Sequence, residues 1–347
     1  MKPGGTGAGG GTKKVGWVVA HVVDIWFLII GFFVLYYAVA DGFDLGVGVI
    51  SLFTRDERDR GVMMAALQSI WQENQTWLVL LGGMLFGAFP MFYSIALSAL
   101  YVPMVLILFG LIFRGIAFEF REQSARPSLW DLSFGLGSLL TALAQGFTLG
   151  AIFYGLPMEG HRFTGTVWSW FHPYSALFAL GVVAGYTMLG SNYLILKTGG
   201  VVRQRGIRCS PVASFLTLVI SVIIYLWTIL RHPSMAQKWL AMPGFLHVAV
   251  FPVLALLVFL LYFRSLRTGP DYAPFAWNVV FVFCSFIGLS VGFYPYIIPN
   301  MVTIQTAAVS STKTLIFMLV VMAIMLPLIL GYIGYKHWIL RGKVENG

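Results

Sequence analysis

Nine long apolar runs divide the chain, and only short polar loops separate them. A membrane-spanning helix needs about 20 mainly apolar residues. We therefore expect spans at residues 18–50, 70–89, 92–120, 130–154, 171–196, 211–231, 243–263, 274–294 and 315–340. Charged residues make up 10% of the chain and apolar residues 59%, whereas a soluble domain carries about 25% charged residues. The sequence predicts an all-α polytopic membrane protein.

The distribution of lysine and arginine predicts the orientation of these spans. Most of the 22 Lys and Arg residues follow the first, third, fifth, seventh and ninth spans. Loops rich in these residues face the cytoplasm, so the N-terminus should lie outside and the C-terminus inside. The net charge of +9 has the same origin and does not indicate nucleic-acid binding.

The chain is expected to form one membrane domain with two short tails. Residues 1–16 are rich in glycine and should be a disordered polar tail. Residues 17–341 should form a single transmembrane domain of nine helices, and residues 342–347 a cytoplasmic tail. No loop is long enough for a soluble domain, so any chemistry must lie within or beside the helices.

Two aspartates, Asp41 and Asp44, interrupt the apolar stretch "AVADGFDLGVGVI". They are three residues apart and therefore share one helix face. A charge within a membrane is normally paired and faces the bundle interior. Arg114, in "LIFRGIAFEFR", should lie at a similar depth near the cytoplasmic face because its span also runs inward. We expect Arg114 to hold the two aspartates.

The second span begins at the same depth with a polar step, "WQENQTW". It places Glu73 in this layer, and Asn74 and Gln75 are expected to donate hydrogen bonds to the aspartates. Trp71 and Trp77 bracket the step. They are interpreted as interfacial or packing residues, with the wall of a pocket or gas path as the alternative.

The acidic pair has two interpretations that the sequence leaves open. It is either a buried ion pair that fixes helix register or a relay for protons from the cytoplasm. Glu119, after Arg114, is a solvated edge residue or part of the same proton path. Gly42 and Gly46 are four residues apart, which favours close helix packing.

Histidine and cysteine usage argues against a haem or metal site in this chain. The six histidines lie mostly at expected helix ends or in loops, and no pair has the matched depth of a bis-histidine haem site. The two cysteines, Cys209 and Cys284, lack a metal-binding spacing. We expect no metal and no haem to be ligated by this chain alone.

Three segments resemble subunit II of the cytochrome bd-type quinol oxidases. They are "ADGFDLGVGVI", "WQENQTWLVLLGGMLFGAFPMFY" and "FRGIAFEFR", and their order and spacing match over the first 125 residues. The rest of the chain matches mainly in its helix pattern, with "YPYIIP" as a weaker local likeness. The resemblance implies two four-helix bundles plus one peripheral helix in a bacterial inner membrane.

The resemblance also implies a complex and a reaction. A partner, subunit I, would carry haems b and d and the quinol site, and the complex would reduce oxygen to water. This chain would stabilise subunit I and contribute a share of the cytoplasmic proton path. A bound quinone or lipid and a small single-helix subunit are further implied partners.

Asp41, Asp44 and Arg114 match the family's paired acids and buried arginine. This chain departs from the family's W-D-G-N-x-x-W pattern, because Gln72 replaces the aspartate and Glu73 the glycine. Either the proton path is re-routed through Glu73, or an acidic residue at this position is dispensable in this chain. The departure is consistent with the cyanide-insensitive branch of the family. The alternative functions are an independent proton-coupled transporter and a purely structural partner.

Overall fold

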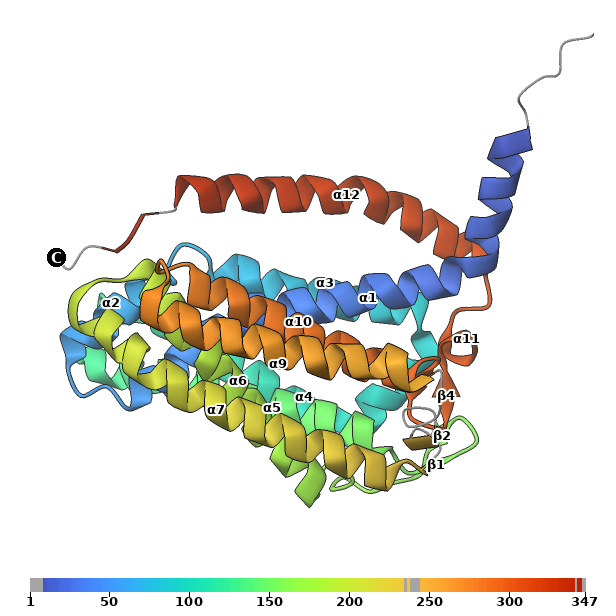
Figure 1. The fold of residues 1–347 in the computed structure, drawn as a ribbon, viewed down its shortest axis with the longest axis horizontal. Coiled ribbons are helices and arrows are strands. Elements are labelled where there is room, and N and C mark those ends of the chain that lie inside the picture. The colour runs from blue at the N-terminus through green and yellow to red at the C-terminus, as the bar shows by residue number, and fades with distance from the viewer. Residues whose placement is uncertain (1–8, 234–235, 238–243, 341, 345–347) are drawn as a thin grey trace, which may run out of the picture.

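The chain folds into a bundle of long helices (Figure 1), seen in a computed structural model that describes residues 9–233, 236–237, 244–340 and 342–344. Within these ranges, side chains are described except for residues 9–17 and 244–249. The helices are α1 (Gly9–Leu52), α2 (Glu57–Ala65), α3 (Trp71–Ala88), α4 (Pro90–Phe120), α5 (Pro127–Tyr154), α6 (Pro173–Lys197), α7 (Gly200–Arg231), α9 (Gly244–Thr268), α10 (Ala273–Phe293), α11 (Ile304–Ala307) and α12 (Thr312–Ile339). The strands are β1 (Met158–Glu159), β2 (Arg162–Phe163), β3 (Tyr296–Ile298) and β4 (Val302–Thr303), which form two antiparallel hairpins.

Eight helices in the described part of the chain are long and apolar enough to cross a membrane. They are α1, α4, α5, α6, α7, α9, α10 and α12, and each overlaps an expected span. The prediction of an all-α polytopic membrane protein is therefore confirmed. The ninth expected span, residues 70–89, is α3, a helix of 18 residues. Its polar first turns keep it out of this set of eight, and the expectation that it crosses the membrane stays a prediction.

Prolines set several of the helix boundaries. α3 ends at Ala88 and α4 begins at Pro90, as the sequence break "FPMF" predicts. Proline is tolerated in a first helical turn because its missing N–H has no partner there. Pro103 lies inside α4, and Leu100 one turn earlier has non-helical backbone angles (φ −119°, ψ 17°). The proline thus accounts for a kink in α4.

The first helix begins earlier than expected. α1 is helical from Gly9, although residues 1–16 were expected to be a disordered tail. Residues 1–8 of that tail lie outside the described residues. Extending an existing helix costs less than starting one, so the apolar run that follows carries the helix back into the polar segment.

The helix α7 also begins earlier, at Gly200 rather than near residue 211. Pro211 is an interior residue of α7 and not its start. The added turns pack against α6: a Cβ on Gly206 would lie 2.7 Å from the backbone oxygen of Ser191. Tertiary packing therefore supports helical structure in a segment whose basic residues suggested a loop.

The long helices form two sets, which agrees with the expected pair of four-helix bundles. α1, α3, α4 and α5 pack together, and α6, α7, α9 and α10 enclose a second core. The sets meet where α6 contacts both α1 and α5. Figure 1 shows α2 and the C-terminal end of α12 at one end of the bundle and the strands at the other.

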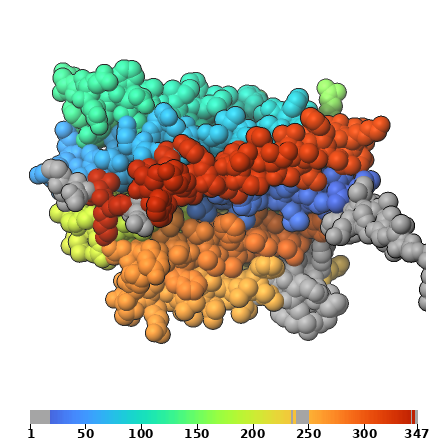
Figure 2. All heavy atoms as spheres, turned by 90° about the horizontal axis from the view of Figure 1, so that it is seen from above, coloured from blue at the N-terminus to red at the C-terminus, as the bar shows by residue number. Residues whose placement is uncertain are grey.

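The last helix, α12, is peripheral and runs along the surface of the molecule (Figure 2). Leu315 is its buried residue, and a stripe that includes Met322 and Leu330 packs on the core formed by α1, α3 and α4. At its first turn the Trp26 indole nitrogen donates to the Leu315 carbonyl oxygen over 3.0 Å. The opposite face, with Phe317, exposes large apolar side chains.

Candidate functional site

The two intramembrane aspartates of α1 lie in the interior of the protein. All ten residues from Asp41 to Ile50 are buried, and both aspartates are fully inaccessible. Arg114 from α4 is also fully buried, and its Nη2 lies 2.5 Å from Asp41 Oδ1. The third helix of the site is α3, from which Asn74 Nδ2 donates to Asp44 Oδ2 over 3.0 Å. Residues far apart in sequence thus meet around two carboxyl groups.

Gln75 does not join this cluster. Its Nε2 has no hydrogen-bond partner among the described residues, so the expected bond to an aspartate is absent there. Successive residues on a helix point about 100° apart. Because Asn74 faces α1, the next side chain necessarily turns away from it.

Three residues that were not predicted from the sequence extend the cluster across the bundle. Tyr37 donates its hydroxyl hydrogen to Asp41 Oδ2 over 3.0 Å. Gln145 of α5 donates from Nε2 to the Tyr37 oxygen over 2.6 Å, and Tyr186 of α6 donates to Gln145 Oε1 over 2.7 Å. Two signals were available: Tyr37 lies one turn before Asp41, and Gln145 is an amide in an apolar helix.

The charges of this cluster do not balance. One guanidinium faces two carboxyl groups, and all three are removed from solvent. Asp44 Oδ1 and two Arg114 nitrogens, Nε and Nη1, have no hydrogen-bond partner among the described residues. A buried charge without a partner is costly, so two ionised carboxylates beside one arginine are unfavourable. The cluster therefore holds one more carboxyl group than its single guanidinium can neutralise.

The other residues of the polar step point elsewhere. Glu73 Oε1 lies 2.5 Å from Lys336 Nζ of α12, which also donates to the Ser69 carbonyl oxygen. Gln72 is exposed. Glu119, at the end of α4, is exposed too, as expected for a solvated edge residue.

The two tryptophans that bracket the step pack against aromatic rings of neighbouring helices. Trp71 stacks on Phe118 of α4 at 5.0 Å between ring centroids, and Trp77 lies 4.0 Å from Tyr36 of α1. Both indoles are buried, and Trp77 is 1% exposed. Each therefore fixes α3 against a neighbouring helix on either side of Asn74.

Small residues let α1 and α6 approach closely beside the aspartates. A Cβ on Gly46 would lie 1.7 Å from the Tyr186 carbonyl oxygen, and one on Gly42 would lie 2.7 Å from the Tyr186 ring. Gly190 of α6 is the reciprocal position, because a Cβ there would lie 2.4 Å from the Val47 nitrogen. Only glycine fits this crossing.

Ion pairs at the α2 end of the bundle form a second polar layer. Asp131 of α5 is almost fully buried and accepts from Arg60 at 2.7 Å and from Arg121 at 2.6 Å. The sequence does not predict that Asp131 binds two arginines, because an acidic residue near the start of a helix is usually exposed to solvent. Arg121, which follows the last residue of α4, is the second arginine that Asp131 binds.

The C-terminal segment is tied to the same end. Asp271, between α9 and α10, accepts from Arg203 at 2.7 Å and from Lys343 at 2.5 Å. The hydrogen bond from Arg203, with that from Lys343, lowers the pKa of Asp271 to about 2. The Val344 amide also donates to the Lys197 carbonyl oxygen over 2.8 Å.

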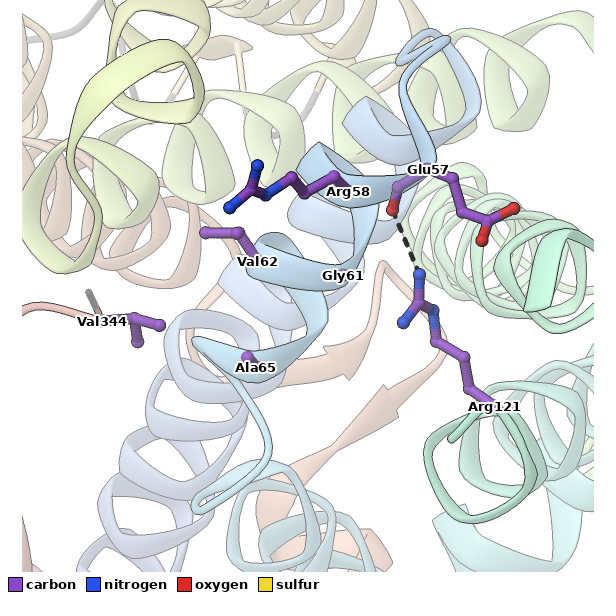
Figure 3. A pocket seen from close by; sticks show the side chains of 7 residues that line it. All are labelled: Glu57, Arg58, Gly61, Val62, Ala65, Arg121 and Val344. Atoms are coloured by element: carbon purple, nitrogen blue, oxygen red, sulfur yellow. Dashed lines mark hydrogen bonds between the residues drawn. The ribbon is translucent and has the colours of Figure 1, made fainter. Parts of the chain in front are cut away.

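An open pocket of about 420 Å³ lies beside α2 at this end (Figure 3). It is lined by Glu57, Arg58, Gly61, Val62, Ala65, Arg121 and Val344. Arg121 crosses it to donate to the Glu57 carbonyl oxygen over 3.1 Å. None of the buried aspartate cluster lines it, so the pocket is a feature of the surface and not of the site.

Two of the described histidines, His172 and His232, make local hydrogen bonds. His172 Nδ1 accepts from the Ser175 amide at the start of α6, and burial lowers its pKa to about 4. His232 Nε2 lies 2.9 Å from the Phe153 carbonyl oxygen. His247 belongs to α9, but its side chain is not among those described. In the described part of the chain no group of three or more His, Cys, Asp or Glu residues is placed to hold a metal ion.

Comparisons with known proteins agree with the fold and show the family. Residues 22–340 match the protein family described as cytochrome bd terminal oxidase subunit II. The chain is 26% identical over 361 residues to cytochrome bd-I ubiquinol oxidase subunit 2 of Escherichia coli (strain K12), which covers 93% of this chain and 95% of that protein. It is 30% identical over 192 residues to cytochrome bd ubiquinol oxidase subunit 2 of Bacillus subtilis (strain 168), covering 54% and 57% respectively. The solved structure of bd oxidase from Geobacillus thermodenitrificans contains a chain of similar fold, with a TM-score of 0.77, 18% identity and coverage of 93% of this chain and 99% of that one.

Proposed function

Because the chain belongs to the family of cytochrome bd terminal oxidase subunit II, we propose that it stabilises a haem-bearing subunit I and conducts protons from the cytoplasm. Membership makes the chain a subunit of a quinol oxidase, an oxidoreductase complex of the bacterial inner membrane. The family match spans residues 22–340, so the alternative of an independent proton-coupled transporter has no support.

The observation that carries the proton role is the unbalanced charge of the buried cluster. Asp41 and Asp44 share one guanidinium, that of Arg114, in a site without solvent access. A carboxyl group that holds a proton in such a site releases it when a neighbouring charge changes. Reduction of oxygen consumes protons, so a group of this kind suits a path toward a haem in the partner.

The orientation of the chain is part of the proposal. The ion pairs of Asp131 and Asp271 gather at the α2 end, where α12 also ends (Figure 1). Loops rich in Lys and Arg face the cytoplasm. This assigns the α2 end to the cytoplasm and the N-terminus to the outside, with the aspartate cluster nearer the inner face.

Glu73 is proposed as a structural residue and not as a replacement for the family's aspartate. Its carboxylate pairs with Lys336 of α12 instead of turning toward Asp44. An ionised acid held by a lysine is a poor carrier for protons, because losing its charge would break the pair. Of the two routes that the sequence left open, the geometry supports the one in which an acid at residues 72–73 is dispensable.

The remaining partners are assigned by the same proposal. Haems b and d and the quinol site belong to subunit I, and His172 and His232 of this chain are held in local hydrogen bonds. A small single-helix subunit, lipid or quinone would contact apolar helix faces such as the exposed side of α12. Purification through a tag on this chain, followed by a reduced-minus-oxidised visible spectrum, tests these assignments. The expected result is haem b and haem d bands with a larger co-purifying subunit.

The proton role is tested with Asp41→Asn and Asp44→Asn in the intact complex. At least one variant should assemble with normal haem bands yet show impaired quinol oxidation and impaired proton uptake in proteoliposomes. Asp271→Asn is the matched control, because it removes a carboxylate at the same end outside the cluster. Normal turnover and uptake in both variants would refute the role. Failure of both to assemble would leave a structural ion pair as the better explanation.

A further inference from the structure

The hydrogen bonds of the Tyr37–Gln145–Tyr186 chain all run in one direction. Tyr186 gives its single hydroxyl hydrogen to Gln145 Oε1. The Gln145 amide nitrogen can only donate, and it donates to the Tyr37 oxygen. The hydroxyl hydrogen of Tyr37 is therefore left for Asp41 Oδ2. The chain ends on a carboxylate oxygen that must accept.

Asp41 is consequently surrounded by donors on both oxygens. Oδ2 accepts from Tyr37 and Oδ1 accepts from Arg114 at 2.5 Å. An ionised carboxylate is purely an acceptor, so this environment fits the ionised form. A proton on either oxygen would face a donor and displace one of the two bonds.

Asp44 has the opposite environment. Asn74 donates to Oδ2, and Oδ1 has no hydrogen-bond partner among the described residues. A proton placed on Oδ1 breaks no bond. Tyr193 of α6, which lies within electrostatic range of Asp44, gives its hydrogen to the Ala66 carbonyl oxygen and not to the carboxyl group. The facing groups on α3, α4 and α6 thus leave Oδ1 available.

We propose that the two aspartates have separate roles. Tyr37, Gln145 and Tyr186 are positioning residues that fix Asp41 as the permanently ionised counter-ion of Arg114, and Asp44 is the carboxyl group that binds and releases the proton. This assignment rests on the proposed proton role of the cluster, which it makes specific to one residue.

The test is infrared spectroscopy of the purified holo-complex, recorded as variant-minus-wild-type difference spectra at neutral pH. Asn74→Leu removes the donor to Asp44, and Tyr37→Phe removes the donor to Asp41. A carboxyl C=O that loses a hydrogen bond moves to higher wavenumber. We expect this shift in Asn74→Leu alone, whereas Tyr37→Phe should change only the stretching bands of an ionised carboxylate.

Asn74→Ala and Gln145→Leu are the second variants if either first variant fails to assemble. Tyr174→Phe is the matched control, since it removes another buried hydroxyl, bonded to Thr228 over 2.8 Å, far along the chain from the cluster. It should produce neither change. The assignment is overturned if the C=O band shifts in Tyr37→Phe alone, in both variants, or in neither of them.

The outcome is separable from that of the proton role itself. If the C=O shift appears only in Asn74→Leu but Asp44→Asn keeps normal proton uptake, the assignment of the proton to Asp44 stands and the proposed path fails. If uptake is lost in Asp44→Asn and the shift instead follows Tyr37, the path stands and the assignment fails.

Discussion

Replacing Gly46 by alanine should destabilise the assembled protein, because α1 and α6 touch through their backbones at this residue. The added Cβ would lie 1.7 Å from the Tyr186 carbonyl oxygen, where an ordinary contact is 3.4 Å or more. Overpacking a core costs roughly 1–3 kcal/mol, and a backbone atom cannot rotate aside as a side chain can. At roughly 2–4 °C per kcal/mol, the upper part of that range lowers the melting temperature by about 5 °C or more.

The assay is thermal melting of the purified complex, followed by size-exclusion chromatography of a fluorescently tagged chain. Gly82→Ala and Gly83→Ala are matched controls, because a Cβ at either position of α3 meets no atom within 4 Å. Alanine favours a helix over glycine by about 1 kcal/mol in water, so these variants should melt at the wild-type temperature or slightly above. A Gly46→Ala complex that melts with the controls would show that the backbone contact does not limit the packing.

Three further predictions concern ion pairs. Asp131→Asn removes the shared charge between two arginines and should destabilise the α2 end by roughly 1–3 kcal/mol; melting checks this, with the exposed Glu119→Gln expected to be silent. Lys336→Met and Glu73→Gln should each loosen the C-terminal end of α12, which hydrogen exchange measures as faster exchange of its amides. The double variant should exchange no faster than either single variant, because both remove the same ion pair. Additive increases in exchange rate would contradict the ion pair. The folded-state pKa of Asp271 is about 2, below about 3.9 in an unfolded chain, so its contribution is complete above pH ~4 and is lost as the pH falls toward 2. In that window the melting temperature of Asp271→Asn should fall less steeply than that of wild type, and parallel slopes would contradict the linkage.

The parts of the site that the sequence predicts are those fixed by depth in the membrane. Asp41, Asp44, Arg114 and Asn74 each lie a countable number of residues from a helix end, and a helix rises 1.5 Å per residue. Depth alone does not determine which way a side chain points around the helix axis. Gln75 shows this: it has the expected depth, but the rotation of α3 that directs Asn74 to Asp44 turns Gln75 away.

The parts that the sequence does not predict depend on contacts between distant helices. Tyr37 is one of 15 tyrosines in the sequence, and its hydrogen bond with Gln145 can be seen only once α5 is packed against α1. The pairing of Asp131 with Arg121 likewise requires that α4 and α5 come together at the correct register. The start of α7 is a third case, because packing on α6 lets the helix begin at Gly200, before the expected start at residue 211.

The close helix crossing and the hydrogen-bond chain depend on one residue, Tyr186. Gly42 leaves room for its ring against α1, since a Cβ there would approach two ring carbons to 2.7 Å. The hydroxyl of the same ring begins the chain that ends on Asp41. A side chain at residue 42 must therefore displace the ring and the donor together, whereas one at Gly46 meets the backbone of Tyr186. Because one tyrosine serves both features, Gly42→Ala should lower the melting temperature and also change the infrared carboxylate bands of Asp41. A lower melting temperature with unchanged carboxylate bands would show that glycine at residue 42 serves packing alone.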